Sequence, residues 1–203
     1  MPHKKEGSAI AAVLRNRICM MQSLTEDIVL HEGALASEFG VSRTPIRQVL
    51  QKLAYERLVE TRSGVGTIVA PLDRASHDQD LKVLRSLYGA AARCCDDHAL
   101  PATVQSELNV LVQTCHESVP GAPSYLKIRS TFLDITSSVA PDPILADAIQ
   151  AAHWRHIRWR MADAAWNQPD TFPFLISTIE ACHEASKSGR SADLLAVLAG
   201  NEI

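Results

Sequence analysis

Residues 35–69 have the sequence LASEFGVSRTPIRQVLQKLAYERLVETRSGVGTIV, and this stretch decides the fold of the N-terminal part of the chain. Its first residues predict a short helix that ends at Gly40, because glycine readily adopts the left-handed conformation that often follows a helix. Ser42 is a favourable N-cap, and Pro45 fits a first helical turn because the amide it lacks would have no intrahelical partner there. We therefore expect two helices separated by a tight turn, the second starting at Arg43.

The second helix is amphipathic. Ile46, Val49, Leu50 and Leu53 recur at three- and four-residue spacing, which predicts a buried stripe. The opposite face carries residue types that hold phosphates and contact base edges in a major groove, namely Arg43, Thr44, Arg47, Gln48 and Gln51.

A hairpin with a basic tip follows this helix. Residues 58–61 and 67–69 favour strands, and they flank the segment RSGVG at 62–66. Glycine in such a tip lets the backbone come close to nucleic acid, which suits insertion into a minor groove. Two helices, a turn and this hairpin together predict a winged helix-turn-helix domain over residues 1–71.

The same residues resemble a known family. The pattern L-A-x-x-x-G-V-S-R-T-P-I-R-x-V-L-x-x-L, followed by G-x-G-T-x-V, is similar to the DNA-binding domains of the GntR family of bacterial transcription regulators over roughly residues 8–71. The resemblance implies operator binding through the S-R-T-x-x-R segment and the wing tip. The candidate DNA-binding residues are Ser42, Arg43, Thr44, Arg47, Gln51, Arg62, Ser63 and Gly64.

One position departs from the family pattern. Gly33 stands where the family often has a polar residue that touches phosphate, so we expect weaker backbone affinity at that end. Charge favours DNA binding only modestly, because residues 1–70 contain nine Lys and Arg against seven Asp and Glu. A winged helix that serves only as a packing or protein-interaction module remains an alternative.

Length and composition limit what the remainder of the chain can form. A chain of 203 residues accommodates a second domain beyond this one. The sequence lacks the long apolar run of a membrane span, and its start leads into a helix rather than a signal peptide, so a cytoplasmic protein is expected. The cysteines are five in number, lack a C-x-x-C pair and predict free, mostly buried thiols.

Everything after a polar linker at 72–78 is expected to be helical. Apolar residues at helical spacing predict an all-α antiparallel bundle over residues 79–203, so the fold class is mostly α. The expected helices cover residues 79–98, 102–117, 123–139, 144–165, 172–187 and 191–199.

The bundle resembles, more weakly, the effector-binding FCD domain of the FadR-like branch of the GntR family. The similarity depends on helix order, on PDPIL at 141–145 and on EASKSG at 184–189. In that family an internal metal is held by one aspartate and three histidines. The matching positions here are Arg129, Leu133, Ile179 and approximately Asn201, and the first three cannot ligate a divalent metal. We therefore expect neither a metal nor another cofactor.

Two further interpretations of the bundle stay open. A metal site rebuilt from His153, His156, Glu180 and His183 is one, because Glu180 and His183 have the Glu-x-x-His spacing of carboxylate-bridged sites. An enzyme whose chemistry Glu180, His183 and His153 carry is the rival from another class. Against both, the sequence shows no complete metal set and no nucleophile with a paired base, so we expect no enzymatic activity.

An effector is expected to meet cationic groups instead of a metal. Arg85 and Arg129 are the candidates, because a guanidinium takes a carboxylate through two parallel hydrogen bonds. Tyr125 and His153 complete the candidate pocket, and three tryptophans could line it as well (Trp154, Trp159 and Trp166). Alternatively, the two arginines pair with internal acids or point to solvent.

The segment 153–160, HWRHIRWR, has the densest mixture of cations and aromatic rings in the chain. This composition can stack on and neutralise a single nucleic-acid strand. An amphipathic bundle helix with an arginine-rich outer face explains it more simply.

The sequence thus predicts a DNA-binding transcriptional regulator, expected to be a repressor. Its expected partners are a double-stranded DNA operator of palindromic form, a second copy of the chain in a homodimer, and a small, acidic effector. A regulator whose effector domain is degenerate and works without a small molecule is the alternative.

Overall fold

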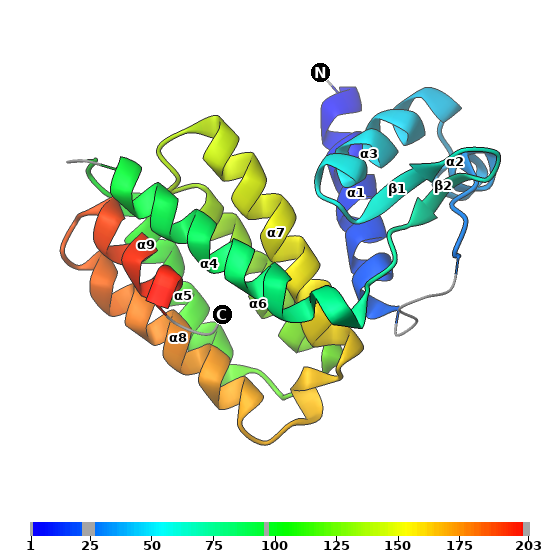
Figure 1. Cartoon of the computed structure of the whole chain (residues 1–203). Helices are drawn as coiled ribbons and strands as arrows, with labels where there is room; N and C mark the ends of the chain where they lie inside the picture. Colours follow the sequence, from blue (N-terminus) through cyan, green and yellow to red (C-terminus); the bar gives the residue numbers. More distant parts are fainter. Residues whose placement is uncertain (1, 22–26, 96–97, 201–203) are drawn as a thin grey trace.

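The computed structural model describes residues 2–21, 27–95 and 98–200 and has a winged helix-turn-helix beside a helical bundle (Figure 1). The elements of the first part are α1 (Pro2–Met20), α2 (Glu32–Phe39), α3 (Arg43–Tyr55), β1 (Val59–Arg62) and β2 (Gly66–Val69). The predicted helix, turn, helix and hairpin are therefore confirmed, including the start of the second helix at Arg43.

The turn between α2 and α3 follows from one glycine. Gly40 has φ of 65° and ends α2 in the left-handed conformation, and the Val41 amide donates to the Ala36 carbonyl at 3.0 Å. Ser42 occupies the N-cap position of α3 with extended backbone, although its side chain makes no capping hydrogen bond. Ile46 and Leu53 are fully buried on the inner side of α3, which fixes the direction of its outer side.

The wing is a two-stranded antiparallel hairpin in which Val59 pairs with Val69 and Arg62 pairs with Gly66. The chain just before α2 extends this sheet, because the Leu30 amide donates to the Thr67 carbonyl at 2.8 Å. This pairing ties the wing to the start of the helix-turn-helix.

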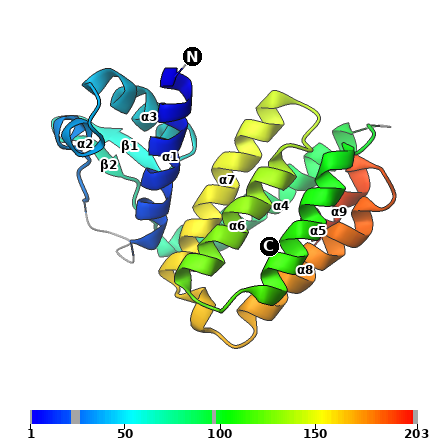
Figure 2. The same cartoon turned by 180° about the vertical axis from the view of Figure 1, so that it is seen from behind.

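The second part of the molecule is a bundle of helices that pack antiparallel to one another, as two views show (Figures 1 and 2). α4 packs on α7 and α9, and α5 packs on α6 and α8. The helices are α4 (His77–Cys94), α5 (Ala102–Glu117), α6 (Ala122–Ser137), α7 (Pro143–Ala162), α8 (Thr171–Ser186) and α9 (Ser191–Gly200), with short 3-10 turns η1 (Arg74–Ser76) and η2 (Ala165–Asn167). The mostly α fold class is confirmed.

Two predicted boundaries were wrong. Asp73 caps η1 by accepting from the Ala75 amide, so helical structure already starts inside the expected linker and α4 begins at His77. α7 was expected to continue to about residue 165, but it ends at Ala162, because Ala164 adopts φ of 49° and turns the chain.

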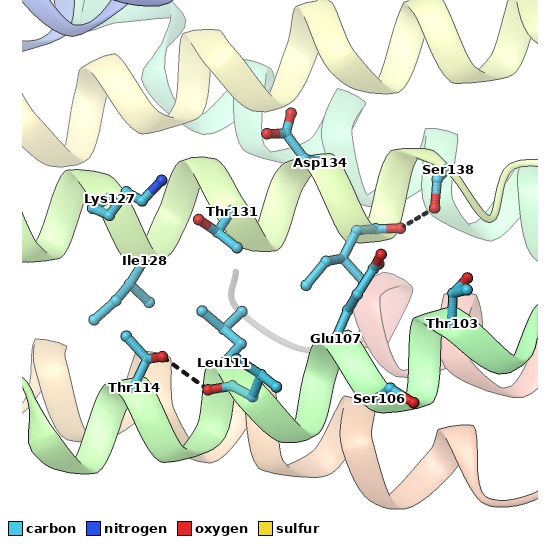
Figure 3. A pocket seen from close by; sticks show the side chains of 12 residues that line it. Thr103, Ser106, Glu107, Leu111, Thr114, Lys127, Ile128, Thr131, Asp134 and Ser138 are labelled. Atoms are coloured by element: carbon cyan, nitrogen blue, oxygen red, sulfur yellow. Dashed lines mark hydrogen bonds between the residues drawn. The ribbon is translucent and has the colours of Figure 1, made fainter.

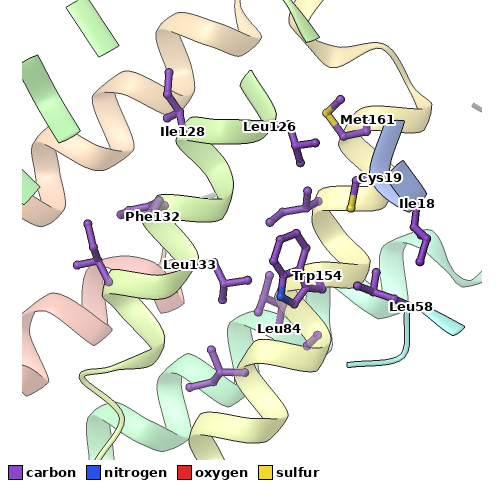
Figure 4. Packing of buried hydrophobic residues seen from close by; sticks show 14 of the residues in the cluster. Ile18, Cys19, Leu58, Leu84, Leu126, Ile128, Phe132, Leu133, Trp154 and Met161 are labelled. Atoms are coloured by element: carbon purple, nitrogen blue, oxygen red, sulfur yellow. The ribbon is translucent and has the colours of Figure 1, made fainter. Parts of the chain in front are cut away.

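The winged domain and the bundle share one continuous hydrophobic core. α1 packs along α7, with Leu14, Ile18 and Cys19 buried in the same cluster as Trp154 and Met161 (Figure 4). Figure 2 shows α1 and α7 side by side as well. The division at residues 72–78 stays a prediction, and α1 is the element that joins the two parts.

Within residues 2–21, 27–95 and 98–200, none of the helices has the length and apolar character needed to cross a bilayer. The five cysteines form no disulfide with one another, and four of them are buried, as the sequence predicted. Burial raises the pKa of the Cys19 thiol and of the Cys182 thiol to about 12, so both are held in the neutral form.

Candidate nucleic-acid interface and the buried cationic cluster

The outer side of α3 presents the residues that the sequence singled out. Arg43, Thr44, Arg47 and Gln51 are all exposed, because the buried stripe of the same helix faces the core. A groove of about 420 Å³ lies between α3 and the wing, and Arg47, Gln51 and Thr61 contribute to its lining. The fold therefore brings the recognition helix and the wing onto one surface.

Acidic residues on this surface hold two of the candidate arginines. The Arg47 Nε donates to Glu32 Oε2 at 2.7 Å, and the Arg62 Nη1 donates to Asp27 Oδ2 at 2.6 Å. Arg62 also reaches Glu60 at 3.2 Å, and these hydrogen bonds, with Asp27 first, raise the pKa of Arg62. Sequence reasoning missed these partners, because the acids lie 15 and 35 residues away along the chain.

Gly33 has a specific role in the arrangement. A Cβ atom at this position would lie 3.4 Å from Nη2 of Arg43, so the Arg43 guanidinium rests directly over the glycine. A Cβ atom at position 33 would therefore make ordinary van der Waals contact with the Arg43 guanidinium, which packs against this face of α2.

The wing tip depends on glycine in two places. Gly64 has φ of 75° and Gly66 has φ of 114°, and the Val65 amide donates to the Arg62 carbonyl at 3.1 Å to close the turn. Ser63 and Gly64 are exposed at the tip. L-residues with side chains rarely adopt these angles, so the tip keeps its shape only with glycine.

The joint between the winged domain and the bundle is made by arginines. Arg15 of α1 donates two hydrogen bonds to the Glu56 carboxylate, at 2.7 and 2.5 Å, and its guanidinium lies 5.6 Å from the centre of the Trp154 ring. Arg158 of α7 donates to the Ala70 carbonyl at 2.5 Å, just after β2. Glu56 is only 3% exposed, so Arg15 is the partner that compensates for burying its carboxylate.

The expected arginine-rich outer face of segment 153–160 is wrong for Arg158. This residue is 3% exposed, and burial lowers the pKa of its guanidinium. Trp154 and Trp159 are also buried, so they are not available to stack on a single nucleic-acid strand. The periodicity of α7 is blurred because opposite sides of this helix face the bundle and the winged domain.

Inside the bundle, the structure places Tyr125, Arg129 and His153 among buried side chains. The Arg129 guanidinium carbon lies 5.0 Å from the centre of the Tyr125 ring, and Arg129 is 1% exposed, so its expected alternative of pointing to solvent is wrong. His153 Nδ1 lies 2.9 Å from the Tyr88 hydroxyl, which also lies 3.1 Å from Thr136 Oγ1.

The electrostatics of this cluster are unusual. The Nε and Nη1 atoms of Arg129 and the Nε2 atom of His153 are buried and have no hydrogen-bond partner among the described residues. Burial, and secondarily the charge of Arg129, lowers the pKa of His153 to about 3, so the ring is neutral. Buried donors without acceptors are costly, which makes this cluster suited to an anionic oxygen ligand.

The other expected pocket residues lie elsewhere or are engaged. Arg85 is half-buried on α4 and already interacts with another group of the protein. Trp154 contacts Arg15, whereas the Trp159 Nε1 donates to Asp80 Oδ2 at 3.0 Å, so these two rings belong to other contacts. Of the aromatic candidates, Tyr125 is the one whose ring lies beside Arg129 among the described residues.

The residues of the alternative metal site are not brought together. In the described part of the chain, no group of three or more His, Cys, Asp or Glu side chains has an arrangement suited to a metal ion. Glu180 Oε1 accepts from Nε2 of a different histidine, His116, at 3.1 Å, while His153 contacts Tyr88. Leu133 and Ile179, at positions where the resemblance implied metal ligands, are fully buried apolar residues, and Asn201 lies outside the described residues.

Comparison with known proteins agrees with the surface on α3 and the wing. Residues 7–69 match the family described as bacterial regulatory proteins, gntR family. The repressor MngR of the mannosyl-D-glycerate transport/metabolism system of Escherichia coli K12 is 36% identical over 78 residues, which are 38% of this chain and 32% of that protein. The chain therefore matches about a third of the length of this curated relative.

Solved structures extend the likeness to the whole fold. Escherichia coli McbR/YncC covers 96% of this chain and 92% of its own chain, with a TM-score of 0.66 at 18% identity. A GntR transcriptional regulator from Rhodococcus sp. RHA1 covers 96% and 92%, with a TM-score of 0.59 at 16% identity. At these identities the likeness concerns the fold alone. The N-terminal third of this chain thus matches the gntR family of bacterial regulatory proteins, and the chain as a whole shares its fold with the two solved proteins.

Proposed function

We propose that this chain is a sequence-specific DNA-binding transcriptional regulator, and that it represses genes in the cytoplasm as a homodimer on a palindromic operator. The observation that carries the proposal is the exposed face of α3, with Arg43, Arg47 and Gln51, placed beside the wing within a gntR-type domain. The name of MngR, which is a repressor, supports repression over activation.

In this proposal α3 enters the major groove and the wing tip approaches the minor groove. Arg43 and Arg47 are suited to bidentate contacts with guanine or to phosphates, and Gln51 to adenine. Arg47 leaves Glu32, and Arg62 leaves Asp27, when phosphate or base oxygens replace the carboxylates. Because both ion pairs are exposed, exchanging them costs little, and they discourage binding of Arg47 and Arg62 to other anions.

We further propose that a small carboxylate modulates operator affinity by binding at Arg129 and His153. Arg129 offers two unpartnered donor atoms, and neutral His153 offers a third when its Nε2 carries the proton. The ligand would stabilise one orientation of α7 over another by its difference in affinity for the two states.

α7 is the element that would carry such a change. His153 faces the buried cluster, the next residue Trp154 contacts Arg15 of α1, and Arg158 holds the Ala70 carbonyl. A displacement of α7 therefore reaches the winged domain without passing through any flexible segment.

A regulator that works without a small molecule is the second candidate. It is favoured by the nearly complete burial of Arg129 and His153, which are 1% and 0% exposed. In that case the cluster serves only the packing of the bundle, and no carboxylate shifts operator affinity.

Selection of bound sequences from random double-stranded DNA tests the main proposal. We expect one palindromic motif, and a 10- to 100-fold loss in affinity for it when Arg47→Ala removes a contact of roughly 1–3 kcal/mol. The matched control is Arg190→Ala, which removes an equally exposed cation near the end of α8. Equal affinity of wild type and Arg47→Ala, together with Arg43→Ala, would overturn DNA reading by α3.

A further inference from the structure

A long apolar groove runs along the outside of the bundle between α5 and α6 (Figure 3). Its volume is about 770 Å³, and its floor is formed by Leu111, Ile128 and Ile135, which are at most 5% exposed. On its rim Val110 is 64% exposed, although valine is a residue that folding normally buries. The other sides of these helices pack on α7 and α8, so the groove is the side of the pair that faces outward.

The charges of the groove have a definite polarity. Lys127 lies in the second turn of α6, and Glu107 lies in the second turn of α5. Because a short loop joins the two helices and makes them antiparallel, these turns are at opposite ends of the groove, roughly two helical turns apart. Figure 3 shows Lys127 and Glu107 apart in this way. Asp134 of α6 also contributes to the lining and is a second acidic residue of the groove.

We propose that this groove is the surface through which two copies of the chain associate. A two-fold axis through the middle of the groove makes the interface isologous, which means that both copies use the same surface. If one residue contacts a second residue of the other copy, the reverse contact also forms. Such an axis places Lys127 of each copy at Glu107 of the other, which forms the same ion pair twice. Val110 of each copy then lies over the apolar floor of the other.

The charge pattern selects a second copy over other occupants. A groove with one positive and one negative end is complementary to itself when it is turned by 180°, whereas an acidic or a basic partner would meet one like charge. The inference rests on the proposed function, because a palindromic operator requires a two-fold symmetric protein. It goes further by naming the helices and residues of the interface.

Sedimentation equilibrium of the full chain tests the surface. We expect wild type to be a dimer and Val110→Glu to raise the dimer dissociation constant at least roughly 100-fold, because two unpaired carboxylates would enter an apolar contact. The matched control is Val13→Glu on α1, where the valine is 45% exposed and lies outside the groove; it should stay dimeric.

A charge exchange gives a second, independent measurement. Lys127→Glu and Glu107→Lys should each raise the dissociation constant roughly three- to tenfold, and the double variant should restore it, because each pair occurs twice. All variants alter exposed side chains, and circular dichroism checks that they fold. The proposal is overturned if wild type is still monomeric at 100 times the concentration used for DNA binding. It is also overturned if neither Val110→Glu nor the charge exchange weakens the dimer.

Binding to a single half-site separates this proposal from the one on DNA. A monomeric Val110→Glu variant should keep wild-type affinity for one half-site while losing its preference for the palindrome. If wild type dimerises through the groove but binds neither the half-site nor the palindromic DNA, the proposed function fails and the proposed interface stands.

Discussion

The ion pair between Arg15 and Glu56 provides the sharpest test of how the winged domain is held. Glu56 is 3% exposed, and both of its oxygens accept from Arg15 at 2.7 and 2.5 Å. Arg15→Met keeps most of the packing over Trp154 but leaves a buried carboxylate without its partner. Breaking a buried pair in this way costs about 3–5 kcal/mol of unfolding free energy. In a chain of this length that corresponds to a fall in Tm of roughly 6–20 °C.

A neighbouring pair on the same helix gives a matched control. Arg17 pairs with Glu38, but the side chains of this pair are 39% and 45% exposed, so Arg17→Met should lower stability far less than Arg15→Met does. Added salt should abolish the effect of Arg17→Met and leave that of Arg15→Met, because screening acts on exposed charges.

The double variant Arg15→Met with Glu56→Leu completes the measurement by urea and thermal unfolding followed by circular dichroism. We expect it to recover most of the loss, because apolar residues often replace a buried ion pair without penalty. Equal losses for the two arginine variants, or a double variant no more stable than Arg15→Met, would refute the reasoning that Glu56 is a buried charge dependent on Arg15.

Four further expectations concern the DNA surface and the bundle. Glu32→Gln should raise operator affinity roughly two- to fivefold in a fluorescence anisotropy titration, because Arg47 no longer has to leave a carboxylate. The control Glu38→Gln makes the same charge change on α2 and should raise operator affinity less. Equal gains for the two variants would contradict the role of the Arg47–Glu32 pair. The free energy of unfolding should fall as pH drops below about 6.5, by about 1.4 kcal/mol per pH unit toward pH 3, because His153 takes a proton near pH 6.5 when unfolded and only at about 3 when folded. His153→Gln should remove this slope in urea unfolding at pH 7, 6 and 5. An unchanged slope would exclude His153 as its source. Purified protein should contain no stoichiometric transition metal by mass spectrometry, and a chelator should leave Tm unchanged; one equivalent per chain, lost together with stability, would show that a ligand set was missed. A carboxylate ligand present at 100 times its Kd should stabilise the protein by about 2.7 kcal/mol, which a thermal-shift screen detects. Arg129→Met should abolish this shift in Tm. A shift that survives in the variant would place the ligand elsewhere.

Local chemistry explains why the N-terminal domain was predictable from the sequence. Gly40, Ser42 and Pro45 mark the turn and the start of α3, and the spacing of Ile46 and Leu53 determines which side of the helix is buried. The exposed positions of Arg43 and Arg47 follow from this spacing. These signals act within a few residues, so no knowledge of distant contacts is needed.

The candidate effector residues were only partly predictable. The sequence named Arg129 and His153 as candidates, but their burial and the absence of hydrogen-bond partners at Nε, Nη1 and Nε2 depend on which helices surround them. The role of Arg158 was wrong in the sequence interpretation for the same reason. An arginine on a helix is usually exposed, and only the docking of α1 and β2 against α7 gives Arg158 the Ala70 carbonyl as a buried partner.

Sequence patterns were enough to predict the winged helix-turn-helix, its exposed basic face and the mostly helical second part. They also showed that residues 129, 133 and 179 are of types that do not ligate a divalent metal. Tertiary packing was needed to show that Glu32 and Asp27 pair with Arg47 and Arg62, and that Arg15 and Arg158 join the two parts. It was also needed to show the apolar groove between α5 and α6, with Lys127 and Glu107 toward its two ends. The physical reason is range. Helix periodicity, capping and turns act between neighbours in the chain, whereas ion pairs, shared cores and grooves join residues tens of positions apart, and their geometry exists only once the helices have packed.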